Sequence, residues 1–151
     1  MWNAAEFHLA LNHLPIIVPI VGIVLLFLDL VHKSITVQRI ALGLILFGAV
    51  ISFPVFVSGN SAEAVVKNYP DVGLLLIRDH KNAAWLAIIS SEIVGILSLI
   101  LLLFSQKKKP VPNFLIHLLL ALALTSSLFM ARAAHFGGKI RHEEIRIDDR
   151  F

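Results

Sequence analysis

The residues of this sequence best suited to chemistry are histidines at the ends of long apolar runs. Five of the seven histidines stand at or near what we expect to be one side of a membrane: His8, His13, His80, His135 and His142. Imidazole is the usual protein ligand of b-type haem, and two imidazoles on facing helices suit an electron-transfer iron. These histidines predict a cofactor or metal site where the apolar runs bring their ends together.

The composition shows what kind of element must position them. The 151 residues are 58% hydrophobic and only 15% charged, with a mean hydropathy of +0.85, which indicates a membrane protein. There is no cysteine, which excludes disulfides, iron–sulfur clusters, thiolate copper sites and the covalent attachment of c-type haem. Any haem would therefore be held without covalent bonds.

Four apolar runs approach or exceed the ~20 residues that a bilayer core requires. They cover about residues 11–31, 40–57, 83–104 and 112–134, and a charged tail occupies residues 139–151. They predict a single all-α domain, an integral membrane protein folded as an up-down four-helix transmembrane bundle. We expect glycine at Ser58-Gly59-Asn60 to stop span two, followed by a short interfacial helix from Ser61 to Pro70, which includes Tyr69.

Basic residues indicate the orientation. Lys107 to Lys109, together with Lys33 and Arg39, mark two short loops on one side, which predicts the cytoplasmic side of a bacterial inner membrane. Both termini of this multi-pass protein then face the periplasm. The net charge of +3 comes from short clusters at span ends, which fits topology signals and lipid headgroups better than nucleic acid.

The topology places the histidines by depth. His13 opens span one, His80 precedes span three and His135 closes span four. Spans one and three are diagonal if consecutive helices are neighbours, so His13 and His80 are the predicted axial pair. His135 with His8 or His142 would serve a second haem, or would hydrogen-bond propionates or quinone.

The end of span four offers further ligand-binding groups. Arg132, Lys139 and Arg141 are cations suited to haem propionates, although Arg132 would equally reach lipid headgroups. Gly137 and Gly138 predict a helix stop and would let the backbone approach a flat ligand closely.

Two further histidines, His32 and His117, lie at similar depth near the inner side. A second haem there would make the protein a transmembrane electron wire. Because Lys33 and the loop follow His32 at once, we favour a role as interface residues for both.

Two acids lie within the spans. Asp29 can pair with Lys33 one helical turn later. Glu92 stands near mid-membrane, where an ionisable group is costly, and either ties spans three and four together, which we favour, or serves a proton path. The hydroxyl side chains that would hold it are Ser90, Ser91, Thr125 and Ser126.

The order of these motifs resembles a known family. His8-x4-His13-Leu14-Pro15, Ser58-Gly59, His80 with Ala83-Ala84, and Ala134-His135-Phe136-Gly137-Gly138 are similar to the bacterial membrane family of domain of unknown function 2231. The resemblance extends from His8 to about Glu144. It implies a four-helix protein with histidines at helix ends and an association with haem-containing, cytochrome-linked respiratory systems.

The sequence thus predicts a b-type haem-binding membrane cytochrome subunit with one or two haems. It would pass electrons between a membrane quinol and a periplasmic or complex-bound partner, such as a c-type cytochrome. We expect a subunit of a respiratory or redox complex rather than a stand-alone enzyme. Two alternatives stay open: a copper or zinc site that uses the same histidines with Glu143 or Glu144, and a cofactor-free subunit that serves assembly.

Overall fold

The computed structural model describes residues 3–69, 72–105, 110–142 and 144–146, and every regular element within these ranges is helical. The five α-helices are α1 (Ala4–Leu11), α2 (Leu14–His32), α3 (Ile35–Val66), α4 (Leu74–Ser105) and α5 (Asn113–Arg141). Four segments are long and apolar enough to cross a membrane, namely α1 with α2, then α3, α4 and α5. The prediction of an all-α protein with four candidate membrane spans is confirmed.

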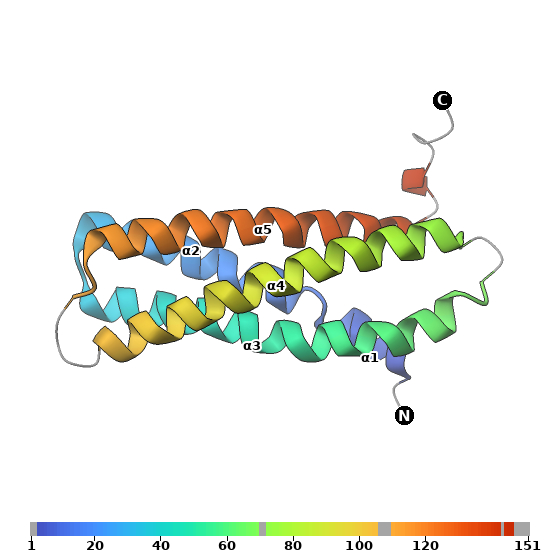
Figure 1. Cartoon of the computed structure of the whole chain (residues 1–151), viewed down its shortest axis with the longest axis horizontal. Coiled ribbons are helices and arrows are strands. Elements are labelled where there is room, and N and C mark those ends of the chain that lie inside the picture. Colours follow the sequence, from blue (N-terminus) through green and yellow to red (C-terminus); the bar gives the residue numbers. More distant parts are fainter. Residues whose placement is uncertain (1–2, 70–71, 106–109, 143, 147–151) are drawn as a thin grey trace.

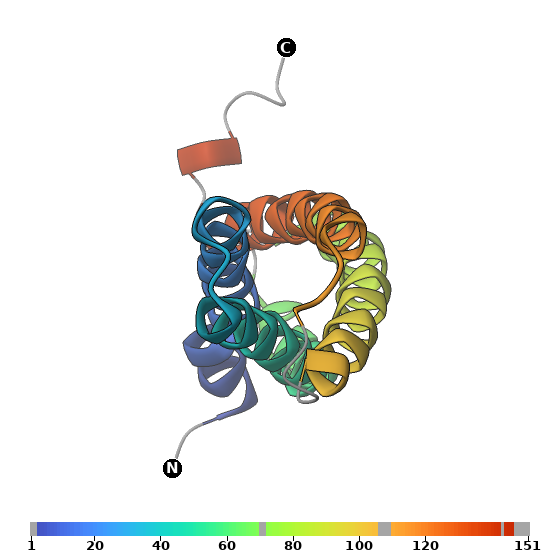
Figure 2. The same cartoon turned by 90° about the vertical axis from the view of Figure 1, so that its left-hand side faces the viewer.

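The long helices form a ring. Helix α2 packs on α3, α3 on α4, α4 on α5, and α5 again on α2, and Figure 2 shows this ring end-on. Helices α2 and α4 are therefore diagonal, as predicted for spans one and three. In Figure 1, α1, the end of α3, the start of α4 and the end of α5 lie at the same end of the bundle. We call this the termini end, because the first and last described residues lie there.

The first span consists of two helices. Asn3 caps α1, where its side chain accepts from the backbone N–H of Glu6 and the Glu6 carboxylate accepts from the backbone N–H of Asn3. The chain breaks at Asn12 and His13, and Pro15 lies in the first turn of α2, as predicted. Proline suits this position because the first helical N–H groups have no partner within the helix. Because of this break, α1 packs against α3. This packing brings His8 into contact with α3.

Two predicted helix stops are wrong. Helix α3 continues through Gly59 to Val66, so the structure does not show a separate interfacial helix, and Pro70 lies outside the described residues. Helix α5 likewise continues through Gly137 and Gly138 to Arg141. A glycine inside a helix costs only about 1 kcal/mol, less than leaving backbone groups unpaired in a bilayer.

The outer surface of the bundle is apolar. Large hydrophobic side chains are exposed on every span, among them Val24, Phe53, Ile96 and Leu128. A continuous apolar coat of this kind fits contact with lipid rather than with water. The lipid environment expected from the composition therefore also agrees with the three-dimensional arrangement.

A buried polar cluster closes the other end of the bundle. Asp29 is only 4% exposed, and its carboxylate accepts from the Gln38 amide at 2.8 Å. The Gln38 carbonyl oxygen accepts in turn from the backbone N–H of Val111 at 3.0 Å. Gln38, rather than the predicted Lys33, is therefore the partner that the structure gives to Asp29. The cluster joins the first two spans to the segment before α5.

Replacing Gln38 with leucine should destabilise the fold. The change leaves the Asp29 carboxylate and the Val111 N–H buried without partners, at about 1–3 kcal/mol for each group. We expect the Tm of the detergent-purified protein to fall by roughly 5 °C or more. The exposed Thr36 supplies the control, because Thr36→Leu should leave the Tm nearly unchanged. An unaltered Tm in Gln38→Leu would disprove the role of this cluster.

Candidate functional site

His8 is held by α3 at the termini end. The side chain is half-buried, and its Nδ1 lies 3.0 Å from the carbonyl oxygen of Val55 and 3.0 Å from the hydroxyl oxygen of Ser58. A carbonyl oxygen can only accept, so Nδ1 carries the proton and donates it. The other ring nitrogen, Nε2, then has no proton and presents a lone pair.

His80 is held in the same way by α5. It stands on the first turns of α4, as predicted, and its side chain is half-buried. Its Nδ1 donates to the carbonyl oxygen of Ala133 at 2.9 Å. This bond selects the same tautomer as in His8, with Nε2 again left as an acceptor.

A glycine supports each imidazole. A Cβ atom at Gly59 would stand 3.6 Å from Cε1 of His8, and one at Gly137 would stand 3.1 Å from Cε1 of His80. Gly59 follows Val55 by one helical turn, and Gly137 follows Ala133 by one turn. Each ring therefore packs against the neighbouring helix, between a backbone carbonyl and the glycine one turn after it.

The two halves of the chain repeat this device. In the first half, the first span carries His8, and the second span supplies the Val55 carbonyl and Gly59. In the second half, the third span carries His80, and the fourth span supplies the Ala133 carbonyl and Gly137. This correspondence is not visible in the sequence, because the supporting groups include backbone carbonyls of Val55 and Ala133, residues without functional side chains. Gly59 and Gly137 were the visible signals, and both were interpreted as helix stops.

The device holds two imidazoles at the same end of the bundle. His8 on α1 and His80 near the start of α4 stand on different halves of the chain, and both elements lie at the termini end (Figure 1). Helices α3 and α4, which pack against each other, connect the two halves. The termini end thus holds two imidazoles, each with an unprotonated Nε2.

The other predicted outer histidines have different surroundings. His13 is exposed at the break before α2 and makes no side-chain capping bond. His135 is exposed and stacks edge-on against Phe136, with ring centroids 5.8 Å apart. The contacts of the described residues do not include one between His13 and His80, the predicted pair, whereas His8 and His80 are held alike by backbone carbonyls.

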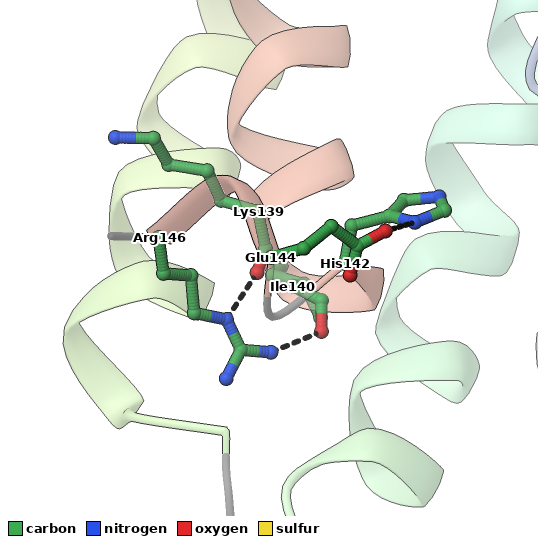
Figure 3. A network of polar contacts seen from close by, with 5 residues as sticks. All are labelled: Lys139, Ile140, His142, Glu144 and Arg146. Atoms are coloured by element: carbon green, nitrogen blue, oxygen red, sulfur yellow. Dashed lines mark hydrogen bonds and ion pairs between the residues drawn. The ribbon is translucent and has the colours of Figure 1, made fainter. Parts of the chain in front are cut away.

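His142 belongs to a small polar network at the end of α5. Its Nδ1 lies 2.9 Å from the Glu144 carboxylate, and Arg146 donates to the carbonyl oxygens of Lys139 and Ile140 at 2.6 and 2.8 Å (Figure 3). The backbone N–H of Glu144 and the His142 side chain hold the pKa of Glu144 below its usual range. This network provides hydrogen-bond donors for two carbonyl oxygens in the last turn of α5.

The remaining predicted cofactor-binding groups lie on α5 near its end. The Arg132 guanidinium lies over the Phe136 ring, 5.8 Å from its centroid, and both Arg132 and Arg141 are exposed. A Cβ at Gly138 would meet Ile145 at 3.6 Å. The structure leaves both arginines accessible to an anion without bringing either into contact with His8 or His80.

The structure does not assemble a site with several metal ligands. In the ranges that it describes, no group of three or more histidine, aspartate or glutamate side chains could hold a metal ion. Glu143, one of the acids in the copper or zinc alternative, lies outside those ranges. The two inner histidines are both exposed, and His117 is bonded to Asn113 of its own helix at 2.7 Å, whereas His32 ends α2.

Glu92 has another partner than the one predicted. Its carboxylate accepts from the Ser52 hydroxyl of α3 at 3.2 Å. Ser90 and Ser126 bond to each other at 3.1 Å, so they, rather than Glu92, join α4 to α5. Glu92 therefore ties span three to span two.

Comparisons with known proteins give no further guidance, because no protein-family model, curated protein or solved structure matches the chain.

Proposed function

We propose that the chain is a membrane cytochrome subunit in which His8 and His80 are the axial ligands of one haem b. The observation that supports this most is the matched pair of imidazoles. Each donates Nδ1–H to a backbone carbonyl, which is the second-shell bond expected of a metal-bound histidine. Each keeps Nε2 free for iron, and both rings belong to elements at the termini end of the bundle.

The chemistry of the donor set fits haem better than a bare metal ion. A porphyrin supplies the equatorial ligands of its iron, so two imidazoles complete a low-spin, six-coordinate centre. Zinc requires three or four protein ligands, and the described residues do not bring so many together. The described residues therefore support the zinc alternative less well than haem.

An unsatisfied polar atom also supports a ligand at this end. The side-chain oxygen of Asn12 is buried and has no hydrogen-bond donor, and its backbone N–H bonds to His8 one turn earlier. Buried polar groups nearly always have a partner, so water or a bound molecule is expected to satisfy this oxygen. Asn12 lies beside one of the two proposed ligands.

The protein residues have defined tasks in this proposal, while haem, when bound, supplies the one-electron chemistry. The carbonyls of Val55 and Ala133 fix the orientation of the imidazoles and raise their basicity. Gly137 leaves room for the His80 ring, whereas a Cβ at Gly59 would meet the His8 ring at ordinary van der Waals distance. Arg132 and Arg141 are accessible cations for the propionates, while His135 and His142 are candidates for hydrogen bonds to propionates or quinone.

The electron path follows from the position of this site. We place the protein in a bacterial inner membrane with the termini end toward the periplasm, supported by Lys33 and Arg39 at the opposite end; Lys107 to Lys109 lie outside the described residues. The protein would hold its haem near the outer face, where the group would supply one-electron transfer between membrane quinol and a c-type cytochrome or another complex subunit. The protein then serves as an electron-transfer subunit.

Reduction by quinol tests this function. The purified full chain, expressed with haem available, should show sharp b-type α and Soret bands after the addition of a reduced short-chain quinone. Bands that appear with dithionite but not with quinol would show that the protein is a cytochrome but that quinol is not its electron donor. A colourless folded protein would remove haem altogether and favour the cofactor-free subunit.

The two glycines give a matched test of the site. Alanine at position 137 would place its Cβ 3.1 Å from Cε1 and 3.3 Å from Nδ1 of His80, so the ring must shift, whereas alanine at position 59 meets His8 at an ordinary 3.6 Å. We expect Gly137→Ala to change the electron paramagnetic resonance g-values of the ferric haem and Gly59→Ala to leave them unchanged. Identical spectra for both variants would contradict the placement of His80.

A further inference from the structure

A small cavity lies in the middle of the bundle, between the four long helices. Its volume is about 10 Å³, roughly the space that one water molecule needs. The residues that line it are Pro15, Ile16, Pro19, Ile45, Ser91, Val94, Ala123, Ser126, Ser127 and Met130. Most of its wall is apolar, but three serines, Ser91, Ser126 and Ser127, bring hydroxyl groups to it, and a buried water needs such polar partners.

Ser91 is the first of two groups here that need a partner. The residue is only 6% exposed, and within the described part of the chain its hydroxyl makes no hydrogen bond. Ser126, by contrast, bonds to Ser90, and Ser127 donates to the carbonyl oxygen of Ala123. An unpaired hydroxyl is costly in an environment without bulk water.

The second group is the carbonyl oxygen of Pro15. In a helix this oxygen would accept from the N–H four residues later, but that residue is Pro19, which has no N–H. Pro15 is buried and lines the same cavity as Ser91. Pro15 on α2, with its freed carbonyl, and Ser91 on α4, with its unpaired hydroxyl, therefore line one space.

We propose that this cavity binds one water molecule, which donates to the Pro15 carbonyl and hydrogen-bonds the Ser91 hydroxyl. Ser127 can accept its remaining proton, since that hydroxyl already donates to Ala123. The water joins the diagonal helices α2 and α4, which do not otherwise pack closely. It satisfies the carbonyl that Pro19 frees, which membrane helices commonly achieve with ordered water.

The water site lies deeper in the bundle than the two histidines, because Ser91 follows His80 on α4 by about 16 Å along the helix axis. Met130 lines the cavity and stands about one turn before Ala133, whose carbonyl holds His80. The site depends only on Pro15, Pro19 and the serines, so it is independent of the proposed haem. Its test therefore needs no spectroscopic signal from a cofactor.

Ser91→Ala tests the proposal by the sign of its effect on the Tm of the detergent-purified full chain. If water is bound, the variant loses one hydrogen bond, and the Tm should fall by about 3 °C. If the cavity is dry, the variant removes an unsatisfied hydroxyl and gains helix propensity, so the Tm should stay unchanged or rise. Either of these results would overturn the proposal.

Ser98→Ala is the matched control. Ser98 lies on the same helix, is fully buried and donates directly to the Leu42 carbonyl at 2.7 Å. Its replacement therefore measures the effect of losing one hydrogen bond, with the same change in helix propensity as Ser91→Ala. We expect similar falls in both variants. An experimental structure should also show water density within hydrogen-bond distance of Ser91 and the Pro15 carbonyl, and clearly resolved empty density there would refute the site.

Discussion

Replacing His80 with alanine is expected to remove the haem from the purified protein almost completely. Haem here would have no covalent attachment, because the chain has no cysteine, so the two imidazoles are its main anchors. His8→Ala should have the same effect, since both rings are held alike by carbonyls of the neighbouring span. A pyridine haemochrome assay, normalised to protein, measures the loss.

His13 and His32 provide the controls for this prediction. Both are exposed, and we expect His13→Ala and His32→Ala to keep the full haem content. The result for His13 also decides between the pair predicted from the sequence, His13 with His80, and the pair that the structure favours. Added imidazole should restore haem binding to His80→Ala if that variant remains folded. Full haem in both His8→Ala and His80→Ala would refute the assignment.

Replacing Gly22 with alanine is expected to destabilise the bundle strongly. A Cβ at this position would stand 2.7 Å from Cγ1 of Ile45 and 2.9 Å from the backbone carbonyl oxygen of Ala41. A backbone oxygen cannot rotate away, so α2 and α3 must separate. Overpacking of this kind costs typically 1–3 kcal/mol, and we expect the Tm to fall by roughly 5 °C or more.

Gly43→Ala is the matched control, because nothing lies within 4 Å of a Cβ at that position. Alanine is the better helix former, so this variant should keep or raise the Tm. Thermal unfolding of both variants, followed by circular dichroism in the same detergent, compares them directly. Equal Tm values would contradict the close approach of α2 and α3 at Gly22.

The sequence predicted what depends on local chemistry. The length of each apolar run identified the four candidate spans, and the missing N–H of Pro15 located the first turn of α2. The helix ends predicted at Gly59 and Gly137 were wrong, because both helices continue through these residues. Packing and the need for continuous backbone hydrogen bonds outweighed the small free-energy cost of glycine in a helix.

The site depends on contacts between distant segments, which the sequence does not reveal. His8 and His13 look equivalent in the sequence, and only the break at Asn12 and the packing of α1 on α3 turn His8 toward Val55. Glu92 likewise could bond to either neighbouring span, and the rotation of α4 brings it to Ser52. Sequence reasoning found the histidine-bearing ends but not which histidines meet.

The central claim is that this bundle holds one haem between His8 and His80. The most direct measurement is the number of haem b groups per folded chain, determined together with the spin state of the ferric iron by electron paramagnetic resonance. We expect one haem per chain with the low-spin signature of two imidazole ligands. A folded chain without haem despite an ample supply, or one whose iron is high-spin, would contradict it.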